Sequence, residues 1–190
     1  MPYLQNALNF VIETIVGLYL TAVILRFLFQ LLQVDFRNPI SRFIIIATSP
    51  PLKILRRFIP GLYGMDLSVV ALILIIGLIK TGLLLALSGY PFNIPGTLVI
   101  TLAEVLNTIA WTFIIVIIGS AILSWVAPVS QHPVAHLINS MSHPLIRPFR
   151  KILPPIQGLD LSPLLALLAL NLIQRLVILP ITDFGRSFFF

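Results

Sequence analysis

Residues 49–68 and 143–162 are two copies of one stretch, and they align without a gap. Each copy runs from a proline through three Lys or Arg side chains and a glycine to the tripeptide Asp-Leu-Ser. The matching residues are Pro50 and Pro144, Arg56 and Arg150, Pro60 and Pro154, Gly64 and Gly158, Asp66 and Asp160, and Ser68 and Ser162. Because an internal repeat dictates how a chain folds, we predict a duplicated architecture with repeats at residues 1–95 and 96–190.

The composition around the two copies indicates an integral membrane protein. The chain is 58% hydrophobic and only 9% charged, and its mean hydropathy is +1.07. Four apolar runs, at about residues 4–32, 67–88, 97–126 and 161–179, reach the roughly 20 residues that a bilayer span needs. We therefore predict an all-α polytopic membrane protein with four transmembrane helices. Two spans per repeat is an even number, so both repeats insert the same way up and are parallel.

Each copy also predicts a short basic amphipathic helix between prolines. At about 100° per residue, apolar side chains such as Leu52 and Ile146 fall on one arc, and the cations fall on the opposite arc. The cations are Lys53, Arg56, Arg57, Arg147, Arg150 and Lys151. Such a helix can lie at the headgroup boundary with its cations toward anionic phosphates. The alternative is a helix packed on its own protein with a solvated basic face, but the apolar flanks favour lipid.

A further short helix precedes each basic segment. Asn38-Pro39 and His132-Pro133 are typical helix starts, with a capping side chain followed by proline at the first position. We expect Pro50 and Pro144 to break these helices, so that each connection is an elbow of two helical pieces.

Two aspartates stand directly before apolar spans. Asp66 and Asp160 can each accept a hydrogen bond from an unpaired backbone N–H at the start of the following helix. This capping role explains the two carboxylates without a catalytic pair, and it places Ser68 and Ser162 in the first helical turn.

The distribution of Lys and Arg predicts the orientation. The connection between the first two spans carries five cations and the connection between the last two carries three, whereas the central turn and the N-terminal flank carry none. By the positive-inside rule, both elbows are cytoplasmic, and both termini and the central turn lie outside the cell inner (plasma) membrane. This rule also explains the formal charge of +6 without a nucleic-acid partner.

Four ionisable residues, Glu13, Lys80, Glu104 and Arg175, fall inside the spans, one in each. Charges there are costly and usually face inward, where they pair. One hypothesis is a polar path for an ion or proton, lined also by Asn107, Asn171 and Gln174. The alternative, which we favour because two acids and two bases balance, is a pair of salt bridges that fix helix register. Arg26, near the end of the first span, is expected to snorkel toward the interface.

The sequence offers no reactive constellation. It has no cysteine and no phosphate-binding glycine loop, GxSxG or HExxH motif. His132 and His136 are four residues apart, which suits a metal site, but no carboxylate lies nearby and capping explains His132 and His143 better. We predict no enzyme activity, no cofactor and no metal ion.

The doubled pattern S/H-P-x-x-[KR]-x-x-R-[RK]-x-x-P-x-x-x-G-x-D-x-S between apolar spans resembles the YggT family of small bacterial inner-membrane proteins. The resemblance covers nearly the whole chain. The second copy departs from it at Pro148, inside the basic helix, and at Pro163. The resemblance implies a link to osmotic or envelope stress tolerance, to cell division, or to the assembly of membrane complexes, and it implies no catalytic residues.

These observations predict a non-enzymatic membrane scaffold or assembly factor. Its elbow cations would bind anionic lipids of the cytoplasmic leaflet, a membrane-protein partner or a second copy of the chain. The alternative function is an ion or small-solute transporter or channel component in osmotic adaptation, which would act through the intramembrane charges.

Overall fold

The computed structural model describes residues 2–61, 66–91, 93–126, 132–153 and 160–190. The motif residues Gly64, Pro154 and Gly158 lie outside this part of the chain. The elements in order are α1 (Pro2–Leu31), α2 (Pro39–Leu55), α3 (Leu67–Leu87), α4 (Ile94–Val126), α5 (Pro133–Ile152), α6 (Ser162–Ile173), the π-helical turn η1 (Gln174–Ile178), α7 (Leu179–Arg186) and the 3-10 turn η2 (Ser187–Phe189). No strand occurs in the described residues.

Four helices are long and apolar enough to cross a membrane: Tyr3–Leu31, Leu67–Leu87, Ile94–Ser124 and Ser162–Phe189. The predicted all-α polytopic fold is thereby confirmed. The fourth helix is longer than predicted, because α6, η1, α7 and η2 follow one another without a break. Proline at position 180 removes an N–H and crowds the carbonyl of the preceding turn, and the widened turn of η1 directly before it accommodates the ring.

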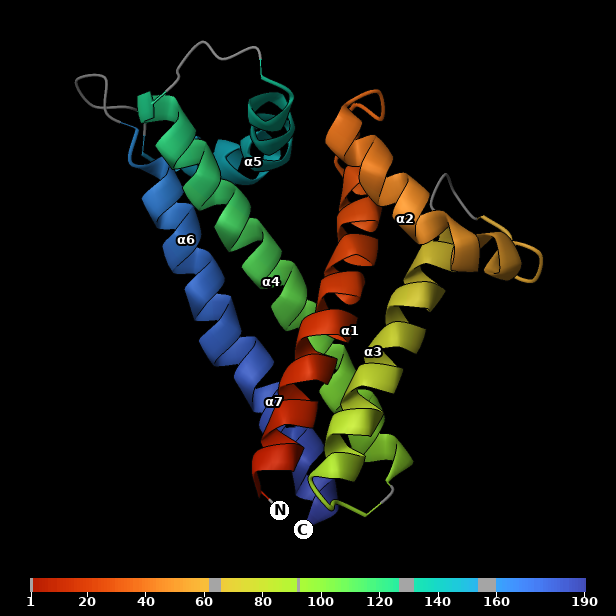
Figure 1. Cartoon of the computed structure of the whole chain (residues 1–190). Helices are drawn as coiled ribbons and strands as arrows, with labels where there is room; N and C mark the ends of the chain where they lie inside the picture. Colours follow the sequence, from red (N-terminus) through yellow and green to blue (C-terminus); the bar gives the residue numbers. More distant parts are fainter. Residues whose placement is uncertain (1, 62–65, 92, 127–131, 154–159) are drawn as a thin grey trace.

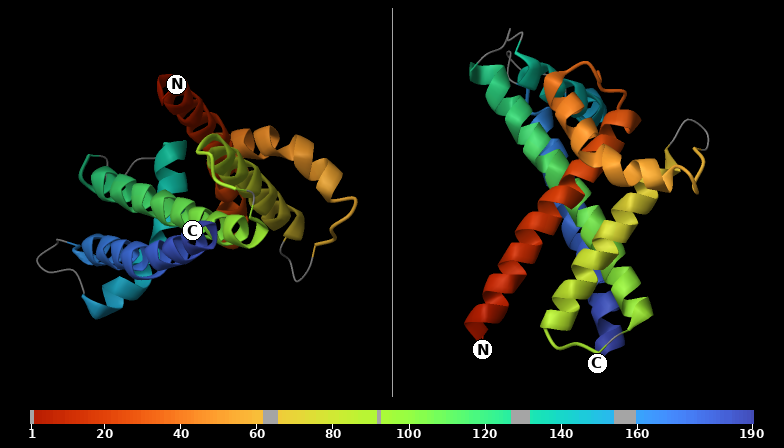
Figure 2. Two further views of the ribbon diagram at one scale, coloured as in Figure 1. Left: turned by 90° about the horizontal axis from the view of Figure 1, so that it is seen from below. Right: turned by 45° about the vertical axis from the view of Figure 1, so that its right-hand side comes forward.

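The two repeats run in the same direction. In Figure 1, both termini and the turn between α3 and α4 lie at one end, and α2 and α5 lie at the other. The right-hand view in Figure 2 shows the same arrangement. The helices α1 and α4 both lead toward the elbow end, and α3 and α6 lead back from it. Which end faces the cytoplasm stays a prediction.

Each elbow is one helix, so the predicted break at the prolines is wrong. Pro50 and Pro51 lie inside α2, and Pro144 and Pro148 lie inside α5. Packing overrides the local cost of these rings, because each helix is held on both sides of its prolines. In α2, Thr48 and Leu52 are both fully buried, and in α5, Met141 and Ile146 are buried.

The apolar arc of the basic segments divides between the protein interior and its surface. Leu52 and Ile146 pack inward, as the alternative interpretation requires. Ile54, Phe58 and Ile152 are instead 62%, 79% and 73% exposed. The elbow ends therefore present apolar side chains to their surroundings beside their cations.

One core joins the two repeats. Leu20, Val23 and Phe29 of α1 are fully buried and belong to a cluster with residues of α2 and α3. The same cluster includes Val105 and Val116 of α4 and Leu137 and Met141 of α5. A hydrogen bond from Asn38 Nδ2 to the carbonyl of Pro133, at 2.7 Å, also links the starts of the two elbow helices.

Helices α3 and α4 approach each other closely at Gly77. A Cβ atom at this position would lie 2.9 Å from Thr101 Cγ2 and 3.3 Å from Val105 Cγ2. Both neighbours are stiff β-branched side chains on α4, so neither can move away cheaply. A Cβ atom at Gly82, on the same helix, would have no neighbouring atom within 4 Å. Gly82 is therefore a matched control.

We expect Gly77→Ala to be less stable than Gly82→Ala by about 1–3 kcal/mol, the usual cost of overpacking. Both variants gain the same helix propensity, so their difference isolates the contact between α3 and α4. Denaturant unfolding in detergent micelles measures it. Equal stabilities would show that the helices separate freely at this point.

Candidate functional site

In the first repeat, the Asp-Leu-Ser tripeptide is tied back to the basic segment. Arg56 Nε and Nη2 donate to Asp66 Oδ2 at 2.9 and 2.6 Å. Asp66 Oδ1 accepts from the backbone N–H of Ser68 at 3.1 Å, which caps α3 as predicted. Ser68 Oγ, which is fully buried, donates to the carbonyl of Ile59 at 3.0 Å. We call this set of contacts the Arg–Asp–Ser lock.

The second repeat contains the same lock. Arg150 Nε donates to Asp160 Oδ2 at 2.8 Å, and Asp160 Oδ1 accepts from the N–H of Ser162 at 2.9 Å. Ser162 Oγ donates to the carbonyl of Leu153 at 3.2 Å. The sequence predicted both aspartate hydrogen bonds at the starts of the spans, although the N-cap of α6 is Leu161 and not Asp160, and it missed the ion pairs. The signal was present, because each arginine precedes its aspartate by the same interval in both copies.

The lock also sets the charge state of Asp160. Partial burial by itself raises the pKa of this carboxyl, but hydrogen bonds from Ser162 and Arg150 and the Arg150 charge outweigh it. The pKa therefore lies below its ordinary value, and Asp160 is ionised at neutral pH.

The six elbow cations separate into two groups. Arg56 and Arg150 are ion-paired within the lock, although their side chains are still 48% and 44% exposed. The other four, Lys53, Arg57, Arg147 and Lys151, are exposed. Because the lock anchors the arginines at the end of each elbow, these four cations stand at defined places on the elbow surface.

The prediction that Arg26 snorkels is wrong. Its residue is only 9% exposed, and its Nη1 donates to the carbonyl of Ile45 and to Thr48 Oγ1, both at 2.8 Å, and to Ser49 Oγ at 3.1 Å. All three acceptors lie on α2, next to α1. They hydrogen-bond the guanidinium inside the protein, so the side chain does not extend to water at the membrane interface.

One of the two salt bridges predicted within the spans is present. Lys80 Nζ of α3 contacts Glu104 Oε1 of α4 at 2.5 Å, and the lysine side chain is only 10% exposed. The first span also passes close to the ammonium group, because a Cβ on Gly17 would lie 3.6 Å from Lys80 Nζ. A buried ammonium in this position needs its carboxylate partner.

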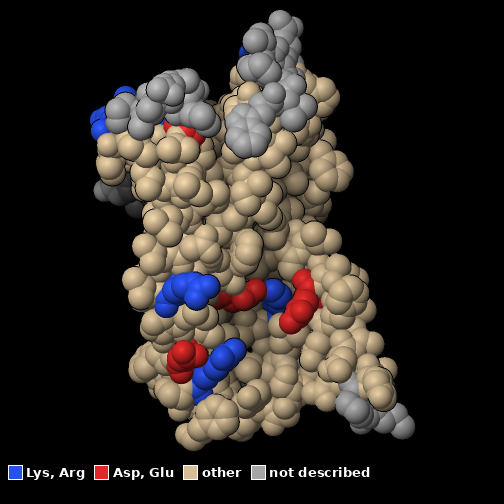
Figure 3. Space-filling view, turned by 90° about the vertical axis from the view of Figure 1, so that its left-hand side faces the viewer, with Lys and Arg blue, Asp and Glu red and all other residues tan. Residues whose placement is uncertain are grey.

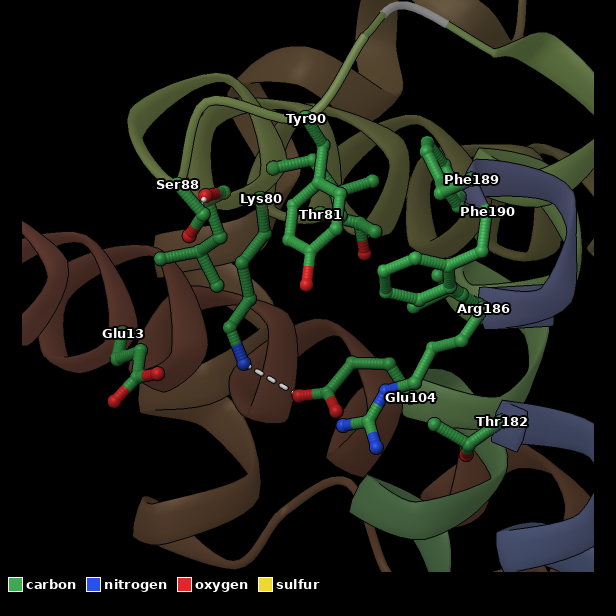
Figure 4. A pocket seen from close by; sticks show the side chains of 13 residues that line it. Glu13, Lys80, Thr81, Ser88, Tyr90, Glu104, Thr182, Arg186, Phe189 and Phe190 are labelled. Atoms are coloured by element: carbon green, nitrogen blue, oxygen red, sulfur yellow. Dashed lines mark hydrogen bonds and ion pairs between the residues drawn. The ribbon is translucent and has the colours of Figure 1, made fainter.

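The second predicted pair is wrong, because Glu13 and Arg175 form no ion pair with the described residues. Glu13 is exposed and, in Figure 4, lies on the opposite side of Lys80 from Glu104. Arg175 is also exposed and belongs to the π-helical turn η1, which changes the register that an α-helical count assumes.

Two neighbouring cavities surround Glu104. The first, of about 550 Å³, is lined by Glu13, Lys80 and Tyr90 among others, and the second, of about 640 Å³, by Asn107, Asn171 and Arg175. Both are lined by Ile100, Glu104, Thr182 and Arg186. Figure 3 shows a band of charged side chains across a face that is uncharged directly above it. The intramembrane charges therefore gather at hollows in the protein surface.

The sequence analysis missed Arg186. The fourth apolar run was predicted to end at about residue 179, whereas Arg186 closes α7 and forms a 3.6 Å ion pair with Asp183. Its side chain reaches into the cavity beside Glu104 (Figure 4). The formal charge at the cavities is therefore more positive than the four predicted residues imply.

The histidines show a capping role at one position. His132 Nδ1 accepts from the N–H of Val134 at 3.3 Å at the start of α5. Within the described ranges, no group of three His, Cys, Asp or Glu residues could hold a metal ion.

The four spans, the doubled elbow and the doubled lock define a small polytopic helical membrane protein built by internal duplication. The sequence profile of the CCB3/YggT family matches the chain twice, over residues 5–87 and 99–181. The chain belongs to the CCB3/YggT family.

Several relatives cover nearly all of the chain. The uncharacterized protein PA0392 of Pseudomonas aeruginosa is 46% identical over 92% of this chain and 90% of its own length. An uncharacterized protein of Vibrio alginolyticus is 33% identical over 88% of this chain and 91% of its own length. The uncharacterized protein YggT of Escherichia coli K12 is 32% identical over 90% of this chain and 88% of its own length. No solved structure matches.

We expect Lys80→Met to destabilise the protein by about 1–3 kcal/mol, because it leaves the Glu104 carboxylate, which is 32% exposed, without its partner. The double variant Lys80→Met/Glu104→Gln should recover most of this loss, since it removes both charges together. The free energies of unfolding of the two single variants and the double variant, measured in micelles, complete the double-mutant cycle. Additive losses would mean that the pair has no coupling.

Proposed function

We propose that this protein is a non-enzymatic scaffold or assembly factor of the bacterial inner membrane, linked to envelope or osmotic stress tolerance or to cell division. The observation that carries the proposal is the doubled Arg–Asp–Ser lock. Each lock fixes a basic elbow to the span that follows it and leaves two cations exposed in each copy: Lys53 and Arg57 in the first and Arg147 and Lys151 in the second.

A fixed array of cations suits a stationary anionic partner. The exposed apolar side chains Ile54, Phe58 and Ile152 lie within the same elbow segments, so that one surface offers both contacts that a headgroup boundary requires. Each cation near an anionic leaflet contributes about 1 kcal/mol, and salt weakens the attraction. In this proposal the elbows face the cytoplasm, as the distribution of Lys and Arg predicts.

The test replaces the exposed cations and keeps the lock. We expect Lys53→Gln/Arg57→Gln to retain less anionic lipid than the wild type when the protein is purified from mixed phosphatidylglycerol and phosphatidylcholine nanodiscs. The difference in retained anionic lipid between the wild type and the variant should shrink as salt is raised, because the attraction is electrostatic. Quantitative lipid mass spectrometry gives the measurement.

The matched control is Arg175→Gln/Arg186→Gln, which removes the same charge from the other end of the protein. If both double variants lose the same amount of anionic lipid, net charge and not the elbow surface governs retention. An undiminished wild-type level in Lys53→Gln/Arg57→Gln would refute lipid binding by the elbows.

A second candidate function, transport of an ion or small solute, is supported by the cavities around Glu104. A carboxylate that is paired to Lys80 and borders two polar cavities could exchange partners as a solute passes. This proposal assigns the Lys80–Glu104 pair a gating role in addition to fixing register.

The transport proposal predicts that wild-type protein in liposomes conducts ions or solutes after osmotic shock and that Glu104→Gln does not. The comparison requires equal insertion of both proteins, checked by protease accessibility. Asn171→Ala, which changes the wall of only the second cavity, separates the two hollows. Flux through Glu104→Gln at the wild-type rate would exclude the mechanism.

A further inference from the structure

The elbow end of each repeat contains a cavity beside the lock, and the two cavities occupy equivalent positions. The first is lined by Arg26, Gln30, Arg56 and Asp66 among others, and measures about 290 Å³. The second, between α4, α5 and α6, is lined at the matching positions by Ser120, Ser124, Arg150 and Asp160, and measures about 560 Å³. The duplicated fold thus contains one site in two versions, and the second version is nearly twice as large.

The difference in size follows from three substitutions between the repeats. Where α1 carries Arg26, Phe27 and Gln30, α4 carries Ser120, Ala121 and Ser124 at the matching positions. Every change replaces a long side chain with a short one. In the first repeat the Arg26 side chain takes the space and bonds to α2. In the second repeat the same space opens beside Asp160.

The side chain that the second cavity lacks, that of Arg26, is a cation, and this indicates the chemistry of one part of the ligand. Arg26, Arg56 and Asp66 line the first cavity together, so that its lining carries two cations and one carboxylate. In the second cavity, Arg150 and Asp160 are the charged lining residues. A ligand that restores the composition of the first site therefore brings a positive group with hydrogen-bond donors, such as a primary ammonium.

The arginine of the second lock identifies the other part of the ligand. Arg56 contacts Asp66 through both Nε and Nη2, whereas Arg150 contacts Asp160 through Nε at 2.8 Å. Within the described residues, the Nη groups of Arg150 have no hydrogen-bond acceptor, and a guanidinium fork suits phosphate oxygens. The Ser120 hydroxyl adds a donor, whereas Ser124 Oγ donates to the carbonyl of Ala121 at 2.7 Å and offers the ligand an acceptor.

The wall of the cavity and its location indicate a membrane amphiphile. The lining continues from the polar groups to Leu161, Leu164 and Leu167 on the α6 side, and Leu164 is 65% exposed. The site lies at the elbow end of the spans (Figure 1), where headgroups of a bilayer would lie and the acyl chains could follow α6.

We propose that this second cavity binds the phosphoethanolamine headgroup of a zwitterionic phospholipid. The ammonium lies between Ser120 and Asp160, which match Arg26 and Asp66 of the first cavity, and the phosphate contacts Arg150. The site includes Arg150 and Asp160 of the second lock but none of the four exposed elbow cations, so its test is independent of the function proposed above.

The test is native mass spectrometry of the purified full-length protein with added phosphatidylethanolamine, phosphatidylcholine or phosphatidylglycerol. We expect one phosphatidylethanolamine to be retained per chain, with a preference of about tenfold over the other two lipids. Phosphatidylcholine keeps the charge but has no ammonium donor, and phosphatidylglycerol has no cation. Equal retention of phosphatidylcholine, or a preference for phosphatidylglycerol, would overturn the proposal without any variant.

Two variants restore the side chains of the first repeat. Ser120→Arg and Ala121→Phe should each abolish the preference for phosphatidylethanolamine, the first by charge and volume and the second by volume alone. Ser187→Arg, an exposed position at the opposite end, adds the same charge as the first variant and should leave binding unchanged. If Ser120→Arg and Ala121→Phe both fold and both retain phosphatidylethanolamine at the wild-type level, the lipid binds elsewhere.

A soluble headgroup separates the lipid from a free metabolite. O-phosphoethanolamine should displace the lipid only at concentrations at least about a hundredfold higher, because it lacks the buried acyl carbons. Displacement at equal concentrations would overturn the assignment of a lipid.

Discussion

The bond between an arginine guanidinium and an aspartate carboxylate at the start of a span determines how each elbow meets the membrane helices. The carboxylate acts with both oxygens: in the first repeat Asp66 Oδ2 binds Arg56 and Oδ1 caps α3. A long apolar helix has few features that fix its rotation or its end, since its side chains are interchangeable in lipid. A polar contact at its first turn defines both. The exposed cations and the elbow cavities are positioned by this contact.

Polar contacts of a second kind hold the spans together around α4. Glu104 binds Lys80 of α3, and one helical turn further along, Asn107 accepts a hydrogen bond from Gln174 of η1 at 3.0 Å. Lys80 and Gln174 are matching positions of the two repeats. Helix α4, the first helix of the second repeat, is thus bonded to the same position of each repeat, once by an ion pair and once by an amide. Duplication supplied equivalent places, and later substitutions gave them different chemistry.

The sequence was sufficient for the parts of the fold that depend on periodicity and end signals. Four apolar runs, the Asp66 cap and the hydrogen bond from Ser162 to Asp160 followed from residue type and spacing, because capping and span length are local properties. The hydrogen-bond acceptors of Arg26 did not follow, nor did the finding that Arg175 forms no ion pair with the described residues. The first depends on how α2 lies against α1, and the second on a π-helical turn that shifts the register. Continuity of α2 through Pro50 was missed for the same reason, since burial of Thr48 and Leu52 decides it.

The shared core has a consequence for biosynthesis. The inner face of α1 packs with Val105 and Val116 of α4 and with Leu137 and Met141 of α5, all of which are translated later. When the first three helices have entered the membrane, this face still contacts lipid, and Asn38 still lacks the Pro133 carbonyl. The first repeat is therefore an intermediate of insertion that the second repeat completes. A ribosome that stalls within α4 would leave this intermediate open to membrane proteases.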